Sequence, residues 1–189
     1  MRMRIIAGEW KGRRLKTVKG LKTRPTSDKI KGAIFNILGD KVLNARVLDL
    51  FAGTGNLSFE ALSRGAKQAV LVEKNNSAWE VLKENRALSG AEERTLIYKM
   101  DAYCFLRQNQ QEKYDLVFLD PPYHQGMVDK VLSVLRRNTL LHPSGVIIIE
   151  TASDEELPKD ILPFELRLTK VYGDTKIWFL QETEMHKEG

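Results

Sequence analysis

The sequence predicts an α/β protein with a mostly parallel sheet that ends in an antiparallel hairpin. From Ala45 onward, short apolar runs alternate with segments of helical periodicity. This alternation is typical of strand–helix–strand units whose sheet is covered on both faces. Near the carboxyl end, two strand-like runs are joined by only residues 172–175, a link too short for a crossover. The first 40 residues follow neither pattern and are expected to form a small extension made of a β-hairpin and a helix.

The composition favours one globular domain without a membrane segment. The chain has 189 residues, of which 42% are hydrophobic and 29% charged, as in ordinary soluble proteins. No apolar run approaches the roughly 20 residues of a bilayer span. The single cysteine, Cys104, excludes an internal disulfide, and these observations together favour a cytoplasmic protein. Cys104 is expected to be buried, because it lies beside Phe105 and Leu106.

The charge of the chain is unevenly distributed. Residues 1–46 contain 13 Lys and Arg against 3 Asp and Glu, whereas the remainder contains 17 against 22. A basic amino-terminal quarter on an acidic body indicates a polyanion-binding arm, and nucleic acid is the expected partner. The alternative is a basic surface that is merely solvated.

The extension begins with two expected short strands, 4–7 and 15–18, joined by a polar connection that contains two glycines. The connection carries Lys11, Arg13 and Arg14, which are candidates for phosphate contacts. Trp10 either stacks on a base or packs the hairpin, and the sequence does not decide between these roles.

A helix is expected after Pro25, because apolar residues recur at helical spacing from Ile30 to Leu38. Its cap is Thr26, Ser27 or Asp28, and Gly39 ends it. The segment 24–26 ahead of the helix is a candidate for ligand contacts, since loops held by rigid elements often carry them. We place the one boundary near residue 40, between an extension (1–40) and the main domain (41–189).

In the main domain, apolar runs predict five strands, at 46–50, 68–72, 95–99, 115–119 and 145–149, with helices between them. The helix that follows the second strand is expected to begin at a capping box formed by Ser77 and Glu80. Two last strands, 165–171 and 176–180, complete a seven-stranded sheet.

A glycine-containing loop follows the first strand of the main domain, between Asp49 and Gly55. Glu73 and Asp101 end the next two strands, and in parallel sheets these ends share one edge, where ligands bind. Glu73 can accept hydrogen bonds from ribose hydroxyls, and Asp101 can meet an adenine edge. The set therefore predicts a nucleotide-like ligand, with a plain glycine turn as the alternative.

The loop does not fit the commoner phosphate sites. No Lys-Ser or Lys-Thr follows the glycines, which excludes a P-loop, and Ser58 stands where a dinucleotide fingerprint has its third glycine. Asp49 would repel a pyrophosphate and would suit a cation, such as the amino group of a methionine moiety. A nicotinamide dehydrogenase is therefore disfavoured.

The tetrad Asp120-Pro121-Pro122-Tyr123 follows the fourth strand of the main domain. The prolines end the strand because they lack an N–H and fix φ, while their carbonyls remain free to accept. The tetrad offers acceptors and an aromatic face but no strong nucleophile, which suits a planar group that carries an NH2.

Together these motifs resemble class I S-adenosylmethionine-dependent amino-methyltransferases. More narrowly, the chain is similar to the RsmD family, whose members methylate N2 of one guanine in bacterial small-subunit (16S) ribosomal RNA. This narrower resemblance is carried by residues 4–8, 11–13, 24–26, 34–36, 48–55, 60–66 and 172–174. Two features depart from the family: Gly32 stands where glutamate is expected, and residues 56–59 are unusual.

The resemblance implies a Rossmann-like class I methyltransferase fold, with S-adenosyl-L-methionine as cofactor and S-adenosyl-L-homocysteine as product. The cofactor-binding residues that it implies are Asp49, Phe51, Gly53, Thr54, Gly55, Glu73, Asp101 and Ala102. The catalytic residues would be Asp120, Pro121, Pro122 and Tyr123, and the RNA-binding residues Lys11, Arg13, Arg14, Arg24 and Thr26.

The substrate implied is 16S rRNA within a small subunit or an assembly intermediate, with no obligate protein partner. No metal is expected, since the three histidines lack ligand spacing. A DNA adenine-N6 methyltransferase would share the tetrad, but the chain has no room for a separate domain that reads DNA sequence. A non-catalytic RNA-binding protein is the alternative of another class.

Overall fold

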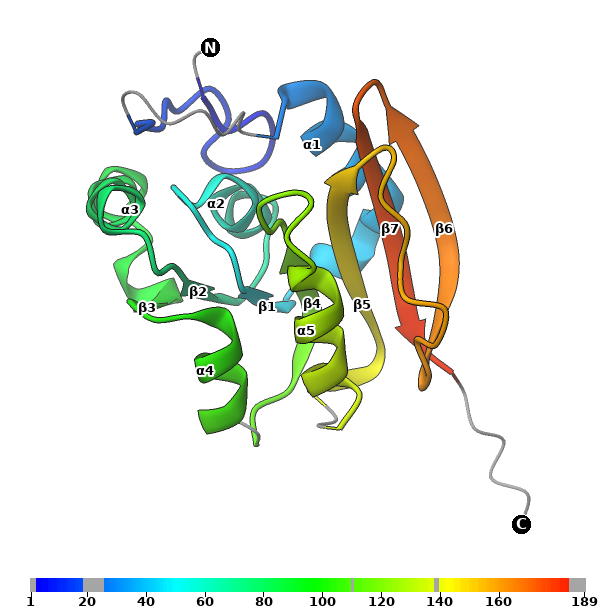
Figure 1. The fold of residues 1–189 in the computed structure, drawn as a ribbon. Helices are drawn as coiled ribbons and strands as arrows, with labels where there is room; N and C mark the ends of the chain where they lie inside the picture. Colours follow the sequence, from blue (N-terminus) through cyan, green and yellow to red (C-terminus); the bar gives the residue numbers. More distant parts are fainter. Residues whose placement is uncertain (1–2, 19–25, 110, 138–139, 184–189) are drawn as a thin grey trace.

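The computed structural model describes residues 3–18, 26–109, 111–137 and 140–183. Seven strands form one sheet in the order β3-β2-β1-β4-β5-β7-β6 (Figure 1). The strands are β1 (Arg46–Asp49), β2 (Gln68–Val72), β3 (Thr95–Tyr98), β4 (Tyr114–Leu119), β5 (Leu141–Ala152), β6 (Phe164–Tyr172) and β7 (Thr175–Glu182). Strands β1 to β5 pair in parallel, and β7 runs antiparallel to both β5 and β6. The predicted α/β fold with a carboxyl-terminal hairpin is confirmed.

In the described residues, five α-helices cover the two faces of this sheet. They are α1 (Asp28–Leu38), α2 (Asn56–Ser63), α3 (Asn76–Ser89), α4 (Ala102–Gln108) and α5 (Met127–Leu135). Helices α1, α2 and α3 pack on one face, and α4 and α5 pack on the other (Figure 1). Within the described part of the chain, none of them has the length and hydrophobicity that crossing a membrane requires.

The structure identifies the residues that cap α1 and α3. The sequence left the cap of α1 open among three residues and predicted a different cap for α3. Ser27 caps α1, and its side chain accepts from the amide of Ile30. The expected capping box of Ser77 and Glu80 is wrong, because α3 begins earlier and Asn75 is its cap. The Asn75 side chain accepts from the amide of Ala78 at 3.0 Å, which satisfies one of the unpaired amide donors in the first turn of the helix.

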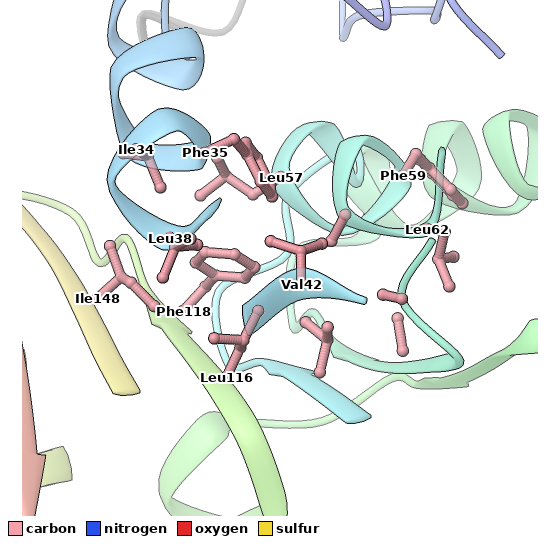
Figure 2. Close-up of a cluster of buried hydrophobic side chains, with 14 of the residues drawn as sticks. Ile34, Phe35, Leu38, Val42, Leu57, Phe59, Leu62, Leu116, Phe118 and Ile148 are labelled. Carbon is pink, nitrogen blue, oxygen red and sulfur yellow. The ribbon is translucent and has the colours of Figure 1, made fainter. Parts of the chain in front are cut away.

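Strand β4 lies in the middle of the core. Leu116 and Phe118 pack on the α1 and α2 side, whereas Val117 and Leu119 pack on the α4 and α5 side. Figure 2 shows Phe118 between Leu38 and Leu116, and the rings of Phe35 and Phe118 lie 6.0 Å apart. Burial on both faces explains why this strand is an unbroken apolar run.

Residues 3–18 pair as a small antiparallel β element, as predicted, but form no regular strands, so the bounds predicted at 4–7 and 15–18 are wrong. One antiparallel bridge joins Arg4 to Arg14. The physical reason lies in α2: the carboxylate of Glu60 accepts from the amides of Ile6 at 2.8 Å and Ala7 at 3.1 Å. These two donors are therefore taken up by a helix side chain, so the antiparallel pairing stays short and does not lengthen into regular strands.

A buried ion pair fastens the extension to the main domain. The Lys31 side chain is fully buried, and its Nζ lies 3.4 Å from Oε2 of the equally buried Glu60. The same Nζ donates to the carbonyl of Arg4 at 2.5 Å and to Oδ1 of Asn56 at 2.8 Å. Burial lowers the pKa of Lys31, against the opposing effect of Glu60. The extension thus packs into the core that β1 and β4 share, while the boundary near residue 40 stays a prediction.

The structure shows the role of Trp10, which the sequence left open, and corrects the predicted burial of Cys104. Trp10 is only 6% exposed, with the guanidinium carbons of Arg13 and Arg94 at 5.7 and 5.2 Å from its ring. It therefore packs the extension. Cys104 is exposed, contrary to prediction, because α4 turns Phe105 and Leu106 into the core and leaves Cys104 outside.

Candidate active site

Four carboxyl groups meet near the carboxyl ends of neighbouring strands. Asp49 ends β1, Glu73 follows β2, Asp120 follows β4, and Glu150 lies late in β5. The parallel register pairs the last residue of β4, Leu119, with the residue just before Glu150. Asp120 and Glu150 therefore occupy equivalent positions on adjacent strands, at the sheet edge where ligands bind in open α/β folds.

The loop after β1 requires glycine at two positions for different reasons. Gly53 has φ +55 and Gly55 has φ +87, in the region that other residues rarely adopt. A Cβ atom on Gly55 would lie 2.2 Å from the ring of Phe59, whereas around Gly53 the nearest atom is 4.0 Å away. Gly55 is thus required by close packing as well as by its backbone conformation.

Asp49 is a buried carboxyl group at the base of this loop. Its side chain accepts a 2.7 Å hydrogen bond from Ser58, so the residue that breaks the dinucleotide fingerprint contacts the site directly. Burial raises the pKa of Asp49 to about 7, and the bonds from Ser58 and the Phe51 amide oppose this shift. A carboxyl group that ionises near neutral pH can hold a cationic ligand.

Glu73 joins the glycine loop to the start of α3. Its Oε2 accepts from the amide of Gly53 at 2.8 Å, and its Oε1 accepts from the amide of Asn75 at 2.6 Å. Burial raises its pKa while these bonds lower it. A carboxylate has about four acceptor positions, so Glu73 keeps capacity for a ligand.

The other predicted cofactor residues lie around the same edge. Asp101 caps α4 by accepting from the amide of Tyr103 at 2.9 Å, and it pairs with Lys74 at 3.3 Å. Ala102 is buried at the first position of α4. Phe51 is half-buried on the apolar cluster beneath α4. The Thr54 hydroxyl points away toward Met3 Sδ, at 3.5 Å.

The tetrad after β4 is joined to β5 through Glu150. The hydroxyl of Tyr123 donates to Glu150 Oε1 at 3.1 Å, and the hydroxyl of Thr26 donates to Oε2 at 3.0 Å. Pro121 is buried and Pro122 is exposed. A cavity of about 110 Å³ adjoins the tetrad, lined in part by Pro121, Tyr123 and Glu150.

The carboxyl groups of this site perturb one another. Burial, together with Glu150 and Asp49, raises the pKa of Asp120 well above its usual range. Burial also raises the pKa of Glu150, against the hydrogen bonds from Thr26 and Tyr123. Such a site favours a ligand that brings hydrogen-bond donors. Sequence reasoning missed Glu150, although it directly follows the predicted strand 145–149 at the expected edge.

The predicted RNA-binding residues fall into different environments. Lys11 and Arg14 are exposed on the extension. Arg13 donates to the carbonyls of Leu88 and Ser89 at the end of α3, so it also holds the extension in place. Thr26 is buried beside Glu150, and Arg24 lies outside the described residues. No group of side chains suited to holding a metal ion occurs among the described residues.

Solved structures share this fold over almost the whole chain. The yhhF protein of Escherichia coli is 32% identical, with a TM-score of 0.86, and the match covers 96% of this chain and 98% of that one. An RNA methyltransferase of Salinibacter ruber, solved with S-adenosyl-L-homocysteine, shares the fold at 14% identity and a TM-score of 0.66, covering 88% and 98% of the two chains. The fold is that of the class I methyltransferases.

Related sequences identify the family to which the chain belongs within the class I methyltransferases. The model of the family described as "Conserved hypothetical protein 95" matches residues 3–181. Ribosomal RNA small subunit methyltransferase D of Haemophilus influenzae is 39% identical over 157 residues, which cover 82% of this chain and 81% of the relative. Its namesake in Escherichia coli (strain K12) is 33% identical over 171 residues, covering 90% and 85%. The chain belongs to this family, the RsmD family, as the resemblance indicated.

Proposed function

We propose that the protein transfers a methyl group from S-adenosyl-L-methionine to the exocyclic N2 amine of one guanine in bacterial 16S rRNA. The observation that carries the proposal is the position of Asp120 at the end of β4, between the strand that leads into the glycine loop and the strand of Glu150, at one edge of a class I methyltransferase fold. Family members named ribosomal RNA small subunit methyltransferase D support the choice of substrate. The protein would act in the cytoplasm, on the small subunit or an assembly intermediate.

The donors and acceptors around the loop fit the proposed cofactor. Asp49, with its pKa raised to about 7, can ionise beside the ammonium of the methionine moiety. Glu73 retains acceptors for the ribose hydroxyls, and Asp101 with the Ala102 amide faces the adenine end. Gly53 and Gly55 let the backbone approach closely. When bound, S-adenosyl-L-methionine supplies an electrophilic methyl group on its sulfonium.

Asp120 and Tyr123 would prepare the amine for attack. An exocyclic amine is a weak nucleophile, because its lone pair is delocalised into the base. Asp120 and the Pro121 carbonyl would accept its two N–H bonds, hold the nitrogen in line with the methyl group and favour a localised lone pair. Asp120 would also counter the positive charge that develops on nitrogen. The cofactor would leave as the thioether S-adenosyl-L-homocysteine, and the methylated nitrogen would lose one proton to solvent after transfer. Tyr123 would stack on a base that has left its helix.

The extension 1–40 would bind RNA, and residues 41–189 would form the methyltransferase domain. Lys11 and Arg14 are exposed there and would contact phosphates, which position RNA without identifying its bases. Arg24, which precedes α1 in the sequence, stays a predicted RNA-binding residue. Arg13 and Thr26 would act mainly by holding the extension and the tetrad in position, given their hydrogen bonds.

A transfer assay tests this function. Purified protein, methyl-labelled S-adenosyl-L-methionine and either small ribosomal subunits or duplex DNA are incubated, and label in the nucleic acid is counted. We expect label in 16S rRNA only. Asp120→Ala is expected to abolish transfer while calorimetry shows S-adenosyl-L-methionine binding largely intact. Labelling of DNA alone, or near-normal turnover by Asp120→Ala, would contradict the proposal.

A further inference from the structure

We propose that Glu150 accepts the ring N1–H of the target base, next to the amine held by Asp120, and thereby selects guanine over adenine and cytosine. The inference deepens the proposed function and rests on it. Glu150 is a buried acceptor one strand away from Asp120 at the same level of the sheet, since Leu119 and Ile149 pair in register.

The surroundings of Glu150 fix its carboxylate at the edge of a cavity. Its side chain is 5% exposed, and it lines the cavity of about 110 Å³ together with Pro121 and Tyr123. Thr26 and Tyr123 each donate one hydrogen bond to it, at 3.0 and 3.1 Å, to different oxygens. A carboxylate offers about four acceptor positions, so each oxygen can accept a further donor from the cavity.

The bases that carry an exocyclic amine differ at the ring nitrogen beside it. In guanine this nitrogen, N1, carries a hydrogen, whereas adenine N1 and cytosine N3 carry a lone pair. Flipped bases are read by hydrogen bonds to this Watson–Crick edge. Guanine therefore presents adjacent donors to Asp120 and Glu150, while adenine or cytosine would turn a lone pair toward a buried carboxylate.

The electrostatics of the pair agree with this assignment. Asp120 and Glu150 raise the cost of ionising one another, and both lie where burial raises the pKa of a carboxyl group. Two neighbouring N–H donors stabilise both carboxylates at once. A ligand that leaves a buried acceptor without a hydrogen-bond donor is strongly rejected. The discrimination is far larger than a difference in apolar contact would give.

The test compares two reconstituted small subunits whose 16S rRNA differs only at the target nucleotide, which carries guanine or 2-aminopurine. 2-Aminopurine keeps the amine and has a lone pair at N1. The measured quantity is the ratio of kcat/KM for guanine over 2-aminopurine. For the wild-type protein we expect a ratio on the order of 10,000. Glu150→Gln, whose amide can also donate, is expected to bring the ratio to within roughly 5.

Two further variants complete the design. Glu150→Met removes the acceptor at similar volume and is expected to lower the ratio as Glu150→Gln does. Glu156→Gln is the matched control, because Glu156 lies on the same cavity but is exposed and pairs with Lys176; it should keep the wild-type ratio.

The outcomes separate the two proposals. A wild-type ratio near 1, or a high ratio that persists in the Glu150 variants, would overturn the role of Glu150 and leave the proposed function standing. If one Glu150 variant does not fold, the other together with the wild-type ratio decides. Failure of the wild-type protein to methylate the guanine RNA would contradict the proposed function itself, and with it this inference.

Discussion

The hydroxyl of Tyr123 donates a 3.1 Å hydrogen bond to Oε1 of Glu150. The two residues come from different strand ends, Tyr123 from the segment after β4 and Glu150 from β5. The bond holds the far end of the tyrosine ring, which lines the cavity beside the tetrad. The aromatic face that would receive the base is therefore positioned before any base arrives, which lowers the entropic cost of orienting the substrate.

Two substitutions of Tyr123 separate ring from hydroxyl. Tyr123→Phe keeps the ring and loses one hydrogen bond, so methyl transfer should fall by about 10-fold or less, as expected for a bond worth about 1 kcal/mol. Tyr123→Ala also removes the ring on which the base would stack, a contact worth roughly 1–3 kcal/mol per base. Methyl transfer by this variant should fall by about 100-fold. Single-turnover transfer to small subunits measures both. Equal losses in the two variants would argue against stacking.

Gly55 and Gly53 offer a matched pair in the glycine loop. Gly55→Ala places a methyl group 2.2 Å from the Phe59 ring and should cost about 3 kcal/mol, because strain in the core adds to backbone strain. Gly53→Ala meets open space and should cost about 1 kcal/mol. Urea unfolding without ligand measures both free energies. Similar costs would show that Gly55 is not tightly packed.

Asp49 should make stability depend on pH. Its pKa is about 7 in the folded protein against 3.8 for the free group, so between these values the native state holds a proton that the unfolded state has lost. The free energy of unfolding therefore falls as pH rises through this window, and levels off above it. Asp49→Asn removes the titrating group. Between about pH 5 and pH 8, the free energy of unfolding of this variant should therefore fall by roughly 2 kcal/mol less than that of the wild-type protein.

Urea unfolding at the two pH values measures this difference. Asp129→Asn, at an exposed position of α5, serves as the control and should keep the wild-type pH dependence. An unchanged fall in Asp49→Asn would show that Asp49 titrates alike in the folded and unfolded states.

Lys11 and Arg14 should contribute to RNA affinity through phosphates. The double variant Lys11→Gln, Arg14→Gln is expected to lower affinity for any RNA sequence and to reduce the slope of log K against log salt by about 1–2. Lys113→Gln, at an exposed position just before β4, is the control. Filter binding at several salt concentrations provides the slopes. An unchanged slope in the double variant would place the RNA elsewhere.

The sequence predicted those parts of the fold that depend on local pattern. Strand β4 was recognisable because burial on both faces requires an unbroken apolar run. Asp49, Glu73 and Asp120 were placed together because parallel strands align their carboxyl ends. The register that sets Asp120 beside Glu150 depends on pairing between distant segments, so Glu150 was missed.

The predictions that failed or stayed open concern residues whose environment depends on the tertiary fold and not on the local sequence. The two segments of the extension pair antiparallel, as predicted, but the expected strands do not form, because Glu60 of α2 accepts two of the backbone amides. Trp10 could not be assigned, because the arginine at 5.2 Å from its ring, Arg94, lies far along the chain. Cys104 was misplaced because its apolar neighbours, not Cys104 itself, face the core.

The guanine-N2 assignment is tested most directly in the ribosome itself. Small-subunit rRNA from cells with and without this gene would be digested and its nucleosides quantified by mass spectrometry, with a plasmid carrying the wild-type gene or Asp120→Ala to restore function. We expect one N2-methylguanine to disappear with the gene and to return only with the wild-type copy. An unchanged N2-methylguanine content would contradict the proposal.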